Sequence, residues 1–446
     1  MKKLFTCILA VILLACACVI PVSAEKDAIY DIALDSRGAY VYNLETGTAI
    51  YEKAADTRMR PASTTKIMTA LVVLEECADP KNTVVTVPDT KMFQYIIDDG
   101  GVHMQLSKGE EFTAYDLLLG MMMNSYCDAA ELLAWHFGGE SVSAFMDKMN
   151  AKAAELGLKY THFDNPHGLD GDTHYSTPRE IAYILEAASE IDLFREIIST
   201  RDYTIPATSR HKARPLSYSV GIYYPSNKRH LDCFVGGKSG FTTAAGRCLA
   251  TLSEKDGVSY ISVFLGANKE NKTYEGNMAQ IETHTLISYA YANYEIKTLL
   301  EKGTPVGTIP VEGAEVSLPV VAGETIRVLA RKGSDPSYQM TLLESLTVSQ
   351  VKNEAEVGVA RVYFNDEETG RIYPLLLLWD GVPVTTKSPL REETENVTEA
   401  VTGIFKQDKV FLTLLILLLA VIAVCIPAIK LTQIFSRRKY HHRPKH

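Results

Sequence analysis

A serine and a lysine three residues apart stand where a polar run gives way to an apolar, helix-spaced run, in RPASTTKIMTALVVLEEC at residues 60 to 77. Residues three apart on a helix share a face, which brings the side chains of Ser63 and Lys66 within reach of each other. The free N–H groups of a first helical turn also favour a developing negative charge. The pattern therefore suits a serine nucleophile with a lysine base, if burial and a second cation keep the lysine neutral. It also suits a helix cap followed by a solvated lysine.

Ser-x-x-Lys spacing alone is a weak indication of catalysis, because the chain repeats it where no strong apolar helix begins, at Ser23/Lys26, Ser209/Lys212, Ser349/Lys352 and Ser436/Lys439. Two further motifs strengthen the first. Ser125 falls in a polar break between apolar helical stretches, in MMMNSYCDAAELLAWHFGG. Lys238-Ser239-Gly240 is expected to open a strand that turns back into another strand, in VGGKSGFTTAAGRCLATL. Three ordered motifs are much more specific than one.

With these motifs the chain resembles the serine-type D-alanyl-D-alanine carboxypeptidases, the low-molecular-weight penicillin-binding proteins of the peptidase S11 type, whose motifs are S-x-x-K, S-x-N and K-[TS]-G. The similarity extends to PASTTKIMTA, to THFDNPHGLDGDTHYSTPREIA and to GGKSGFTTAAGRCLA, and covers roughly residues 28 to 384. It implies a penicillin-binding-protein and β-lactamase-like α+β catalytic domain, an antiparallel sheet with a helical subdomain. A small all-β sandwich domain and a C-terminal transmembrane helix are expected to follow.

The resemblance also implies the reaction. Ser63 is expected to attack the carbonyl of the penultimate D-alanine of a peptidoglycan stem peptide, and Lys66 to take its proton. Ser125 is expected to relay a proton to the leaving D-alanine nitrogen. Water then releases the acyl-enzyme, β-lactam antibiotics act as covalent inhibitors, and no metal or cofactor takes part.

Substrate binding is expected around the third motif. Lys238 and Ser239 would bind the terminal carboxylate, and the backbone N–H groups of Ser63 and Phe241 would form the oxyanion hole. Gly240 would let the substrate backbone lie against the strand.

Two residues depart from the family pattern. Ser239 stands where threonine is more frequent, and it keeps the hydroxyl. Cys127, expected to contact substrate, stands where the S-x-N motif has asparagine, and Asn124 does not restore the spacing. A thiol is only a weak donor, so substrate positioning is the step that this exchange affects. Cys127 either points into the cleft beside Ser125 or turns inward as a small apolar residue.

Two other functions fit parts of the pattern. A β-lactamase of the same fold would need a water-activating glutamate in a Glu-x-x-Leu-Asn pattern, and Glu155-Leu-Gly-Leu-Lys lacks the asparagine. The other alternative is an ectodomain that binds peptidoglycan without turnover, because Cys127 replaces the asparagine of the S-x-N motif. His162, His167 and His174 match no zinc signature and are expected to lie in a loop near the site.

The two ends of the chain predict a membrane protein. Residues 1 to 24 have the basic start, apolar middle and small-residue cleavage site of a signal peptide. Residues 410 to 429 are uncharged and long enough to span a bilayer, and a basic tail follows at residues 430 to 446. The catalytic domain is therefore expected outside the cell membrane, on a single-pass anchor. The net charge of −9 gives no basic surface for nucleic acid.

Between these ends the composition changes twice. Residues 25 to 297 mix strand and helix signals, including a hairpin in AYVYNLETGTAIYEK and helices opened at Thr113 and Thr177. Residues 298 to 384 contain short β-branched runs of a β-sandwich, and residues 385 to 409 form a polar linker. Four cysteines remain outside the membrane, with no paired spacing: Cys77, Cys127, Cys233 and Cys248.

Overall fold

The computed structural model describes residues 28–267, 277–312, 314, 316–364 and 367–379. The described residues divide into two compact units, one formed by those up to Leu300 with Thr325–Ser337 and the other by Glu301–Glu324 with those from Tyr338 to Trp379. The predicted signal peptide, linker, membrane helix and basic tail lie outside the described residues. None of the helices in the described part combines the length and apolar character that crossing a bilayer requires.

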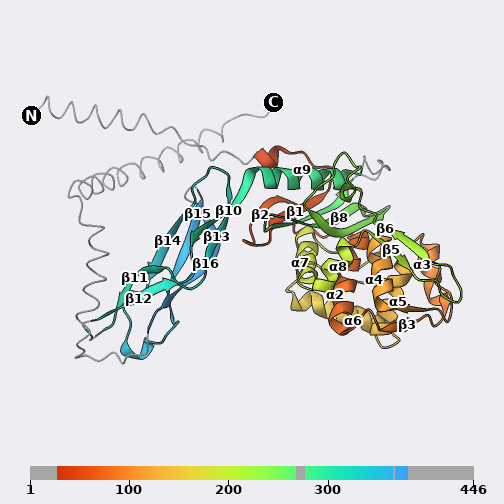
Figure 1. Ribbon diagram of the computed structural model, residues 1–446, viewed down its shortest axis with the longest axis horizontal. Helices are drawn as coiled ribbons and strands as arrows, with labels where there is room; N and C mark the ends of the chain where they lie inside the picture. The colour runs from red at the N-terminus through yellow and green to blue at the C-terminus, as the bar shows by residue number, and fades with distance from the viewer. Residues whose placement is uncertain (1–27, 268–276, 313, 315, 365–366, 380–446) are drawn as a thin grey trace, which may run out of the picture. The chain divides into compact units, whose positions relative to one another are not determined.

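The first unit is built on a five-stranded antiparallel sheet in the order β2-β1-β9-β8-β7. Its strands are β1 (Gly38–Asn43), β2 (Ala49–Lys53), β7 (Phe234–Thr242), β8 (Gly246–Lys255) and β9 (Val258–Ala267). The predicted hairpin is confirmed, because β1 and β2 pair across the Glu45-Thr46-Gly47 turn. Helix α9 (Met278–Asn293) packs on β8 and β9, while α7 (Pro178–Ser189) and α8 (Asp192–Ser199) pack on the sheet from the helical side (Figure 1).

The helical part surrounds α2 (Lys66–Glu76), which contacts α7, α8 and the helices α4 (Ala114–Met123), α5 (Cys127–Phe137) and α6 (Val142–Glu155). Every residue of α2 from Lys66 to Leu74 is buried. The remaining elements are short: η1 (Ala28–Asp31), η2 (Ala62–Thr65), β3 (Val84–Thr86), η3 (Thr90–Phe93), α3 (Gln94–Asp98), β4 (Glu111–Thr113), β5 (Asp202–Ile205), β6 (Arg214–Ser217) and η4 (Gly221–Tyr223). Thus the helix that follows the predicted nucleophile is the central helix of its unit.

Side-chain caps start the helices where the sequence predicted them. Thr113 and Asp116 form a complete capping box at α4. At α7 the Thr177 hydroxyl accepts from the Glu180 N–H, with proline at the first helical position. The Glu180 carboxylate instead accepts from the backbone of Lys159 and Tyr160, so it fixes the preceding loop rather than closing a box.

The second unit is all β. Its sheet has the order β11-β12-β16-β15-β14, with β11 (Pro305–Pro310), β12 (Ser317–Ala322), β14 (Ser337–Leu342), β15 (Glu356–Phe364), β16 (Glu367–Leu377) and the short η6 (Val348–Gln350). β10 (Tyr294–Leu300) pairs with β13 (Ile326–Arg331), and both belong to the first unit. The boundary expected between residues 297 and 298 therefore falls inside a strand, because β13 returns from later in the chain to pair with β10.

Candidate active site

Ser63 and Lys66 lie together at the start of α2. Ser63 is in η2, Lys66 is the first residue of α2, and the Lys66 Nζ donates to the Ser63 Oγ at 3.0 Å. Ser63 is partly exposed, whereas Lys66 is fully buried. The backbone turns sharply before the serine, since Ala62 has a φ of +49°, in the left-handed region that non-glycine residues rarely adopt.

Burial favours the neutral form of Lys66 and lowers its pKa, while nearby Cys127 and Asp128 raise it in part. Burial and the charge of Lys66 lower the pKa of Lys238 well below its ordinary value. Two buried amines that repel each other favour a state in which at least one is neutral. A second amine therefore lies near Lys66, and burial favours the neutral form of both.

Two further contacts hold Lys66. Its Nζ donates to the backbone carbonyl of His167 at 2.7 Å and lies 3.4 Å from the Cys127 Sγ. The His167 carbonyl is a functional group that the sequence analysis missed, because a backbone oxygen has no residue-type signal. With Ser63 these partners fix the direction of the amine.

Cys127 faces Lys66. It is the first residue of α5, only 4% exposed, and its N–H donates to the Val102 carbonyl at 2.7 Å. Cys127 is buried, as expected if its side chain turns inward, but its thiol contacts the Lys66 amine, which is a polar group of the site.

Ser125 lies in the predicted break between α4 and α5 with a φ of +63°, and its partly exposed hydroxyl has no hydrogen bond to a described residue. That hydroxyl is available to a substrate.

The third motif lies in the middle of β7, not at its start as expected, because pairing with β8 begins at Phe234. Lys238 is fully buried and its Nζ donates to the Ser239 carbonyl at 2.7 Å. The Ser239 Oγ lies 3.1 Å from the Ser219 Oγ. Phe241 is 50% exposed, with the Arg247 guanidinium 5.5 Å from its ring centre.

Gly240 has a role that the sequence analysis did not predict. A Cβ at this position would lie 2.7 Å from the Ser63 nitrogen and 3.2 Å from the Thr64 nitrogen. Glycine therefore lets β7 approach the nucleophile turn. The close approach brings the backbone of Phe241, the next residue, toward Ser63.

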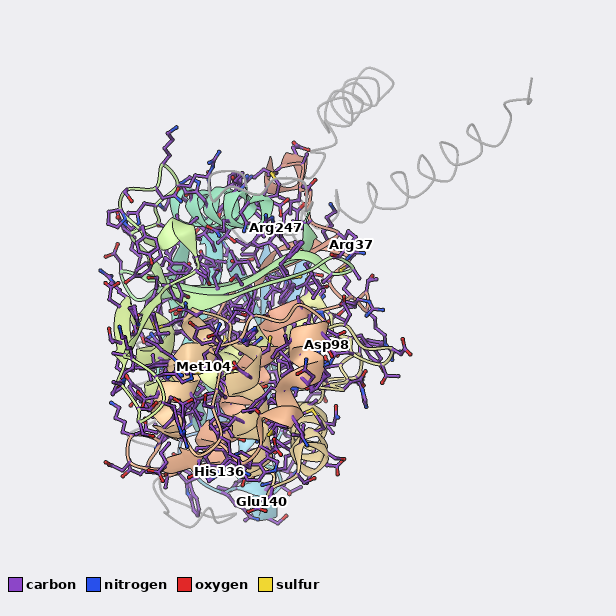
Figure 2. All side chains as sticks on the ribbon, turned by 90° about the vertical axis from the view of Figure 1, so that its right-hand side faces the viewer. Arg37, Asp98, Met104, His136, Glu140 and Arg247 are labelled. Atoms are coloured by element: carbon purple, nitrogen blue, oxygen red, sulfur yellow. The ribbon has the colours of Figure 1, made fainter. Side chains whose placement is uncertain are left out.

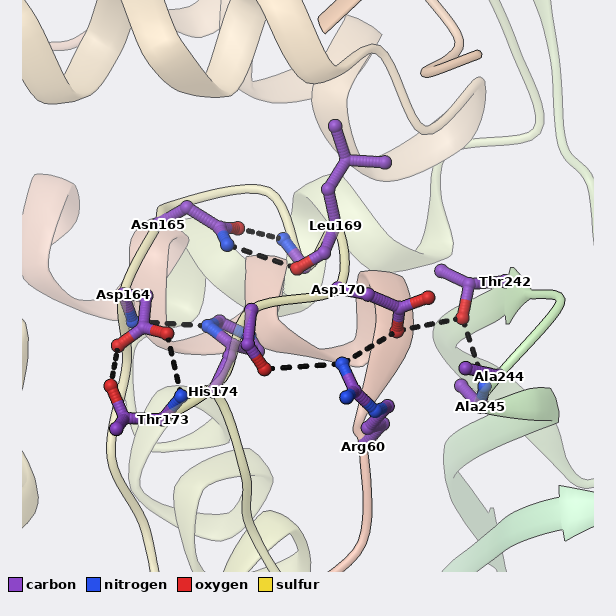
Figure 3. Close-up of polar contacts among 12 residues, drawn as sticks. Arg60, Asp164, Asn165, Leu169, Asp170, Thr173, His174, Thr242, Ala244 and Ala245 are labelled. Carbon is purple, nitrogen blue, oxygen red and sulfur yellow. Dashed lines mark hydrogen bonds and ion pairs between the residues drawn. The ribbon is translucent and has the colours of Figure 1, made fainter. Parts of the chain in front are cut away.

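The loop between α6 and α7 bonds to Arg60, three residues before Ser63, and to the end of β7 (Figure 3). The Arg60 guanidinium lies 3.5 Å from the Asp170 carboxylate, which also accepts from the Thr242 hydroxyl at the end of β7. His174 accepts from the Asp164 N–H through Nδ1, so its Nε2 carries the proton and donates to the Thr65 hydroxyl. Burial lowers the pKa of His174 to about 4, which keeps it neutral.

The three histidines of this loop make separate contacts, as expected of loop residues near the site. His162 is partly exposed and bonds the Thr173 carbonyl, while His167 and His174 are buried. Over the described ranges, no group of three or more histidine, cysteine or acidic residues is placed to hold a metal ion. Cys77, Cys127, Cys233 and Cys248 are all buried and free of disulfides.

Comparison with known proteins agrees with this geometry. Residues 22–269 match the Peptidase S11 family model, described as D-alanyl-D-alanine carboxypeptidase. Residues 294–388 match the penicillin-binding protein 5, C-terminal domain. The chain is 29% identical over 307 residues to the D-alanyl-D-alanine carboxypeptidase DacF of Bacillus subtilis (strain 168), and the match covers 68% of this chain and 75% of that protein.

An enzyme of Streptomyces sp. (strain K15), also called a D-alanyl-D-alanine carboxypeptidase, is 39% identical over 178 residues, which are 39% of this chain and 61% of that protein. A solved structure of a variant of the Streptomyces K15 DD-transpeptidase has a TM-score of 0.53 and 30% identity, covering 58% of this chain and 99% of that one. Penicillin-binding protein 5 from Haemophilus influenzae shares the fold, with a TM-score of 0.66 at 23% identity over 78% of this chain and 97% of that one.

The K15 structures include one variant with a serine replaced by alanine and another with a cysteine replaced by asparagine, at positions two residues apart. Ser125 and Cys127 have the same separation. A serine and a cysteine at this spacing thus occur in both proteins. Given the family match over more than half of its length, the chain belongs to the Peptidase S11 family of D-alanyl-D-alanine carboxypeptidases and carries a penicillin-binding protein 5 C-terminal domain.

Proposed function

We propose that this enzyme removes the terminal D-alanine from peptidoglycan stem peptides through an acyl-enzyme on Ser63, and that β-lactams acylate the same serine. The observation that carries the proposal is the 3.0 Å hydrogen bond from the Lys66 amine to the Ser63 hydroxyl, made by a lysine that is fully buried. A buried lysine with a lowered pKa is a competent general base near neutral pH.

The reaction proceeds in two steps. The neutral Lys66 amine takes the Ser63 proton while Oγ bonds to the carbonyl carbon of the penultimate D-alanine, and the Ser63 and Phe241 N–H groups stabilise the oxyanion. The C–N bond then breaks, and the D-alanine nitrogen leaves with a proton delivered through Ser125. Water attacks the ester with Lys66 again as base, which releases the shortened peptide and the free serine.

The terminal carboxylate of the substrate is assigned to Lys238 and Ser239. Ser239 is partly exposed, and the buried Lys238 amine donates to its backbone carbonyl. Because an anion favours the protonated form of a neighbouring amine, substrate binding raises the pKa of Lys238 and pairs the charges. Binding thereby helps to keep Lys66 neutral.

Glu155 does not support the alternative of a β-lactamase, because it is exposed at the end of α6 and pairs with Lys152. A second candidate activity is transfer of the acyl group to an amine in place of water. It is favoured by the serine and cysteine spacing shared with the K15 protein, which is titled a DD-transpeptidase. Adding glycylglycine to the assay tests it, since transfer yields a new peptide at the expense of the hydrolysed one.

Two assays test the proposal. One measures release of D-alanine from a peptide ending in D-alanyl-D-alanine, and the other measures labelling by a fluorescent penicillin. Ser63→Ala is expected to abolish both. Ser349→Ala is the matched control, because it belongs to another Ser-x-x-Lys pair and lies in the C-terminal unit. Full labelling of Ser63→Ala would reject Ser63 as the nucleophile.

We further propose that the mature catalytic domain lies outside the cell membrane. Residues 1 to 24 would be removed as a signal peptide, and residues 410 to 429 would anchor the chain behind the linker at residues 385 to 409. The charge difference across the anchor supports this orientation, with Glu392, Glu393 and Glu395 before it and Arg437, Arg438 and Lys439 after it.

A further inference from the structure

Tyr95 is a surface residue whose hydroxyl bonds a buried side chain next to the proposed base. It lies on α3, whose last residue Asp98 is labelled in Figure 2, in the helical part and below the sheet in that view. Tyr95 is 42% exposed, and its hydroxyl oxygen lies 2.8 Å from Nε2 of the fully buried His167. The same histidine uses its backbone carbonyl to accept from the Lys66 amine.

The proton positions in this contact follow from the other nitrogen of the His167 ring. Nδ1 accepts from the Leu169 N–H at 3.2 Å, so it carries no proton. Burial, together with the charge of Lys66, lowers the pKa of His167 well below its ordinary value, so the ring is neutral. Its single proton is therefore on Nε2, and the Tyr95 oxygen accepts it. The Tyr95 O–H is left to donate toward the nearby Glu131 carboxyl.

The turn around His167 links its side chain to its carbonyl. The Asn165 Oδ1 accepts from the Gly168 N–H at 2.7 Å, and the Asn165 NH₂ group donates to the Leu169 carbonyl at 2.9 Å (Figure 3). With the bond from the Leu169 N–H to the imidazole, these contacts make the turn compact. A shift of the imidazole therefore shifts the carbonyl that binds Lys66.

Loss of the Tyr95 hydroxyl would leave the His167 Nε2–H buried without an acceptor at hydrogen-bond distance in the described chain. The Glu131 Oε2 is 3.8 Å from Nε2 and has no hydrogen bond to any described residue. A buried donor without a partner is costly, so the ring is expected to turn toward Glu131. The His167 carbonyl would then leave the position in which it holds the Lys66 amine.

We propose that Tyr95 is a positioning residue for Lys66, because its bond to the His167 imidazole keeps the His167 carbonyl against the Lys66 amine. This rests on the proposed function, in which Lys66 takes the proton of Ser63. The contacts are continuous, with 2.8 Å from Tyr95 to His167, 2.7 Å from the His167 carbonyl to Lys66 and 3.0 Å from Lys66 to Ser63. An exposed residue of a short helix thus sets the direction of the base.

Tyr95→Phe removes the hydroxyl and keeps the ring. It is expected to slow penicillin acylation about three- to tenfold, because Lys66 is less firmly directed at Ser63. Stopped-flow labelling measures the rate. Tyr160→Phe is the matched control, since Tyr160 is 43% exposed and its hydroxyl bonds no described residue. Its rate should stay within about twofold of the native one.

The pH dependence of the acylation rate separates positioning from a loss of packing. A carbonyl accepts more strongly from an ammonium than from an amine, so a displaced His167 carbonyl lowers the pKa of Lys66. The acid limb of the profile, on which Lys66 loses its proton, should therefore move to lower pH in Tyr95→Phe. The other titratable groups that face Lys66 or His167 are left in place: Cys127, Asp128, Glu131, His174 and Lys238.

His167→Leu removes both ring nitrogens and tests the route of the effect. If Tyr95 acts through the imidazole, adding Tyr95→Phe to the His167→Leu chain should change the rate by less than about twofold. An equal slowing in that chain would overturn the proposal. A native rate in Tyr95→Phe, an unmoved acid limb, or the same slowing in Tyr160→Phe would overturn it as well.

The pKa of Lys66, read by NMR from lysine labelled with ¹³C at Cε, reports the contact without turnover. Lys66→Arg identifies the signal. A lower Lys66 pKa in Tyr95→Phe, in a protein whose Ser63→Ala variant still labels fully, would contradict the proposed function and retain the role of Tyr95. An unchanged Lys66 pKa, with labelling abolished in Ser63→Ala, would contradict the role of Tyr95 and retain the function.

Discussion

Lys66, the proposed general base, contacts three neighbours, of which two come from distant parts of the chain. Ser63 is three residues away, Cys127 is 61 residues away and the His167 carbonyl is 101 residues away. Of the three, the thiol is the weakest hydrogen-bond acceptor. The residue at position 127 therefore sets how firmly the amine is held and how much polar contact remains for a substrate amide.

Cys127→Asn is expected to raise the kcat/KM of D-alanine release by about two- to tenfold. An asparagine oxygen can accept from Lys66 while its NH₂ group donates to the substrate, and one neutral hydrogen bond is worth about 0.5 to 1.5 kcal/mol. Steady-state kinetics and a thermal melt of both proteins provide the measurement. A less stable variant with no gain in kcat/KM would show that the position serves packing alone.

Glu131 is a buried carboxyl group near the site. It lies on α5 one turn beyond Cys127, and its buried Oε2 has no hydrogen bond. His167 Nε2 is 3.8 Å away, but burial lowers the pKa of His167 well below its ordinary value, so the imidazole is neutral and offers no charge. Burial raises the pKa of Glu131 to about 7.

A folded-state pKa above the unfolded one favours the protonated carboxyl, so the stability that Glu131 contributes below about pH 4.5 is lost as the pH rises through 7. Glu131→Gln is therefore expected to match the native enzyme at pH 5 and to be more stable by about 1 to 3 kcal/mol at pH 8.5. Urea unfolding at both pH values measures this. Glu111→Gln, an exposed glutamate on β4, should show no such pH dependence, and an equal gain in both variants would refute the assignment.

The sequence was sufficient to single out Ser63, Lys66, Ser125 and Lys238 as candidates, because each belongs to a motif whose residue types are rare together. It was not sufficient for the His167 carbonyl, since a backbone oxygen looks the same at every position. Nor could it show that Cys127 faces Lys66, because orientation depends on how α5 packs beside α2. The glycine after His167, in PHGLDG, was the available signal of a close backbone approach.

At the scale of elements, the site is formed where η2, β7 and the loop between α6 and α7 meet. The helices and the hairpin were predictable from their caps, turns and periodicity, as α4 and β1-β2 show. The start of β7 could not be predicted in this way, because pairing with β8, and not the motif, sets where the strand begins. Two glycines, Gly168 and Gly240, allow these elements to touch.

Gly168→Ala is expected to lower the rate of penicillin acylation by at least about tenfold. Its Cβ would lie 1.9 Å from the Ala62 carbonyl oxygen and 3.0 Å from the Ser63 nitrogen, so the nucleophile turn must move, and small displacements of reacting groups are costly. Stopped-flow labelling measures the rate. Gly257→Ala is the matched control, because it has a similar positive φ with nothing within 4 Å.

Both variants carry the backbone strain of a left-handed alanine, of about 1 to 2 kcal/mol, and should lose similar stability from that source. Only Gly168→Ala adds the clash. Equal acylation rates in the two variants would mean that the loop between α6 and α7 does not position Ser63.

At the scale of the whole molecule, the proposed catalytic residues all belong to one unit, formed by Lys26–Leu300 with Thr325–Ser337. Because β13 of this unit follows β11 and β12 in sequence, the chain cannot be cut at the predicted domain boundary without separating β10 from its partner. An intact catalytic unit therefore needs the chain at least through Ser337, and a shortened enzyme should end after the C-terminal β unit.

A chain ending after residue 384 is accordingly expected to keep the Ser63 site and to lose the proposed anchor at residues 410 to 429. After signal-peptide cleavage it should appear in the soluble fraction and label with penicillin at the rate of the full-length enzyme, whereas the full-length enzyme should sediment with membranes. Fractionation followed by fluorescent penicillin labelling measures both properties at once. Ser63→Ala in the same shortened chain is the control for specific labelling. If the shortened, cleaved chain still sediments with membranes, a second attachment such as lipidated Cys16 must hold it. Residues 410 to 429 would then not be the sole anchor.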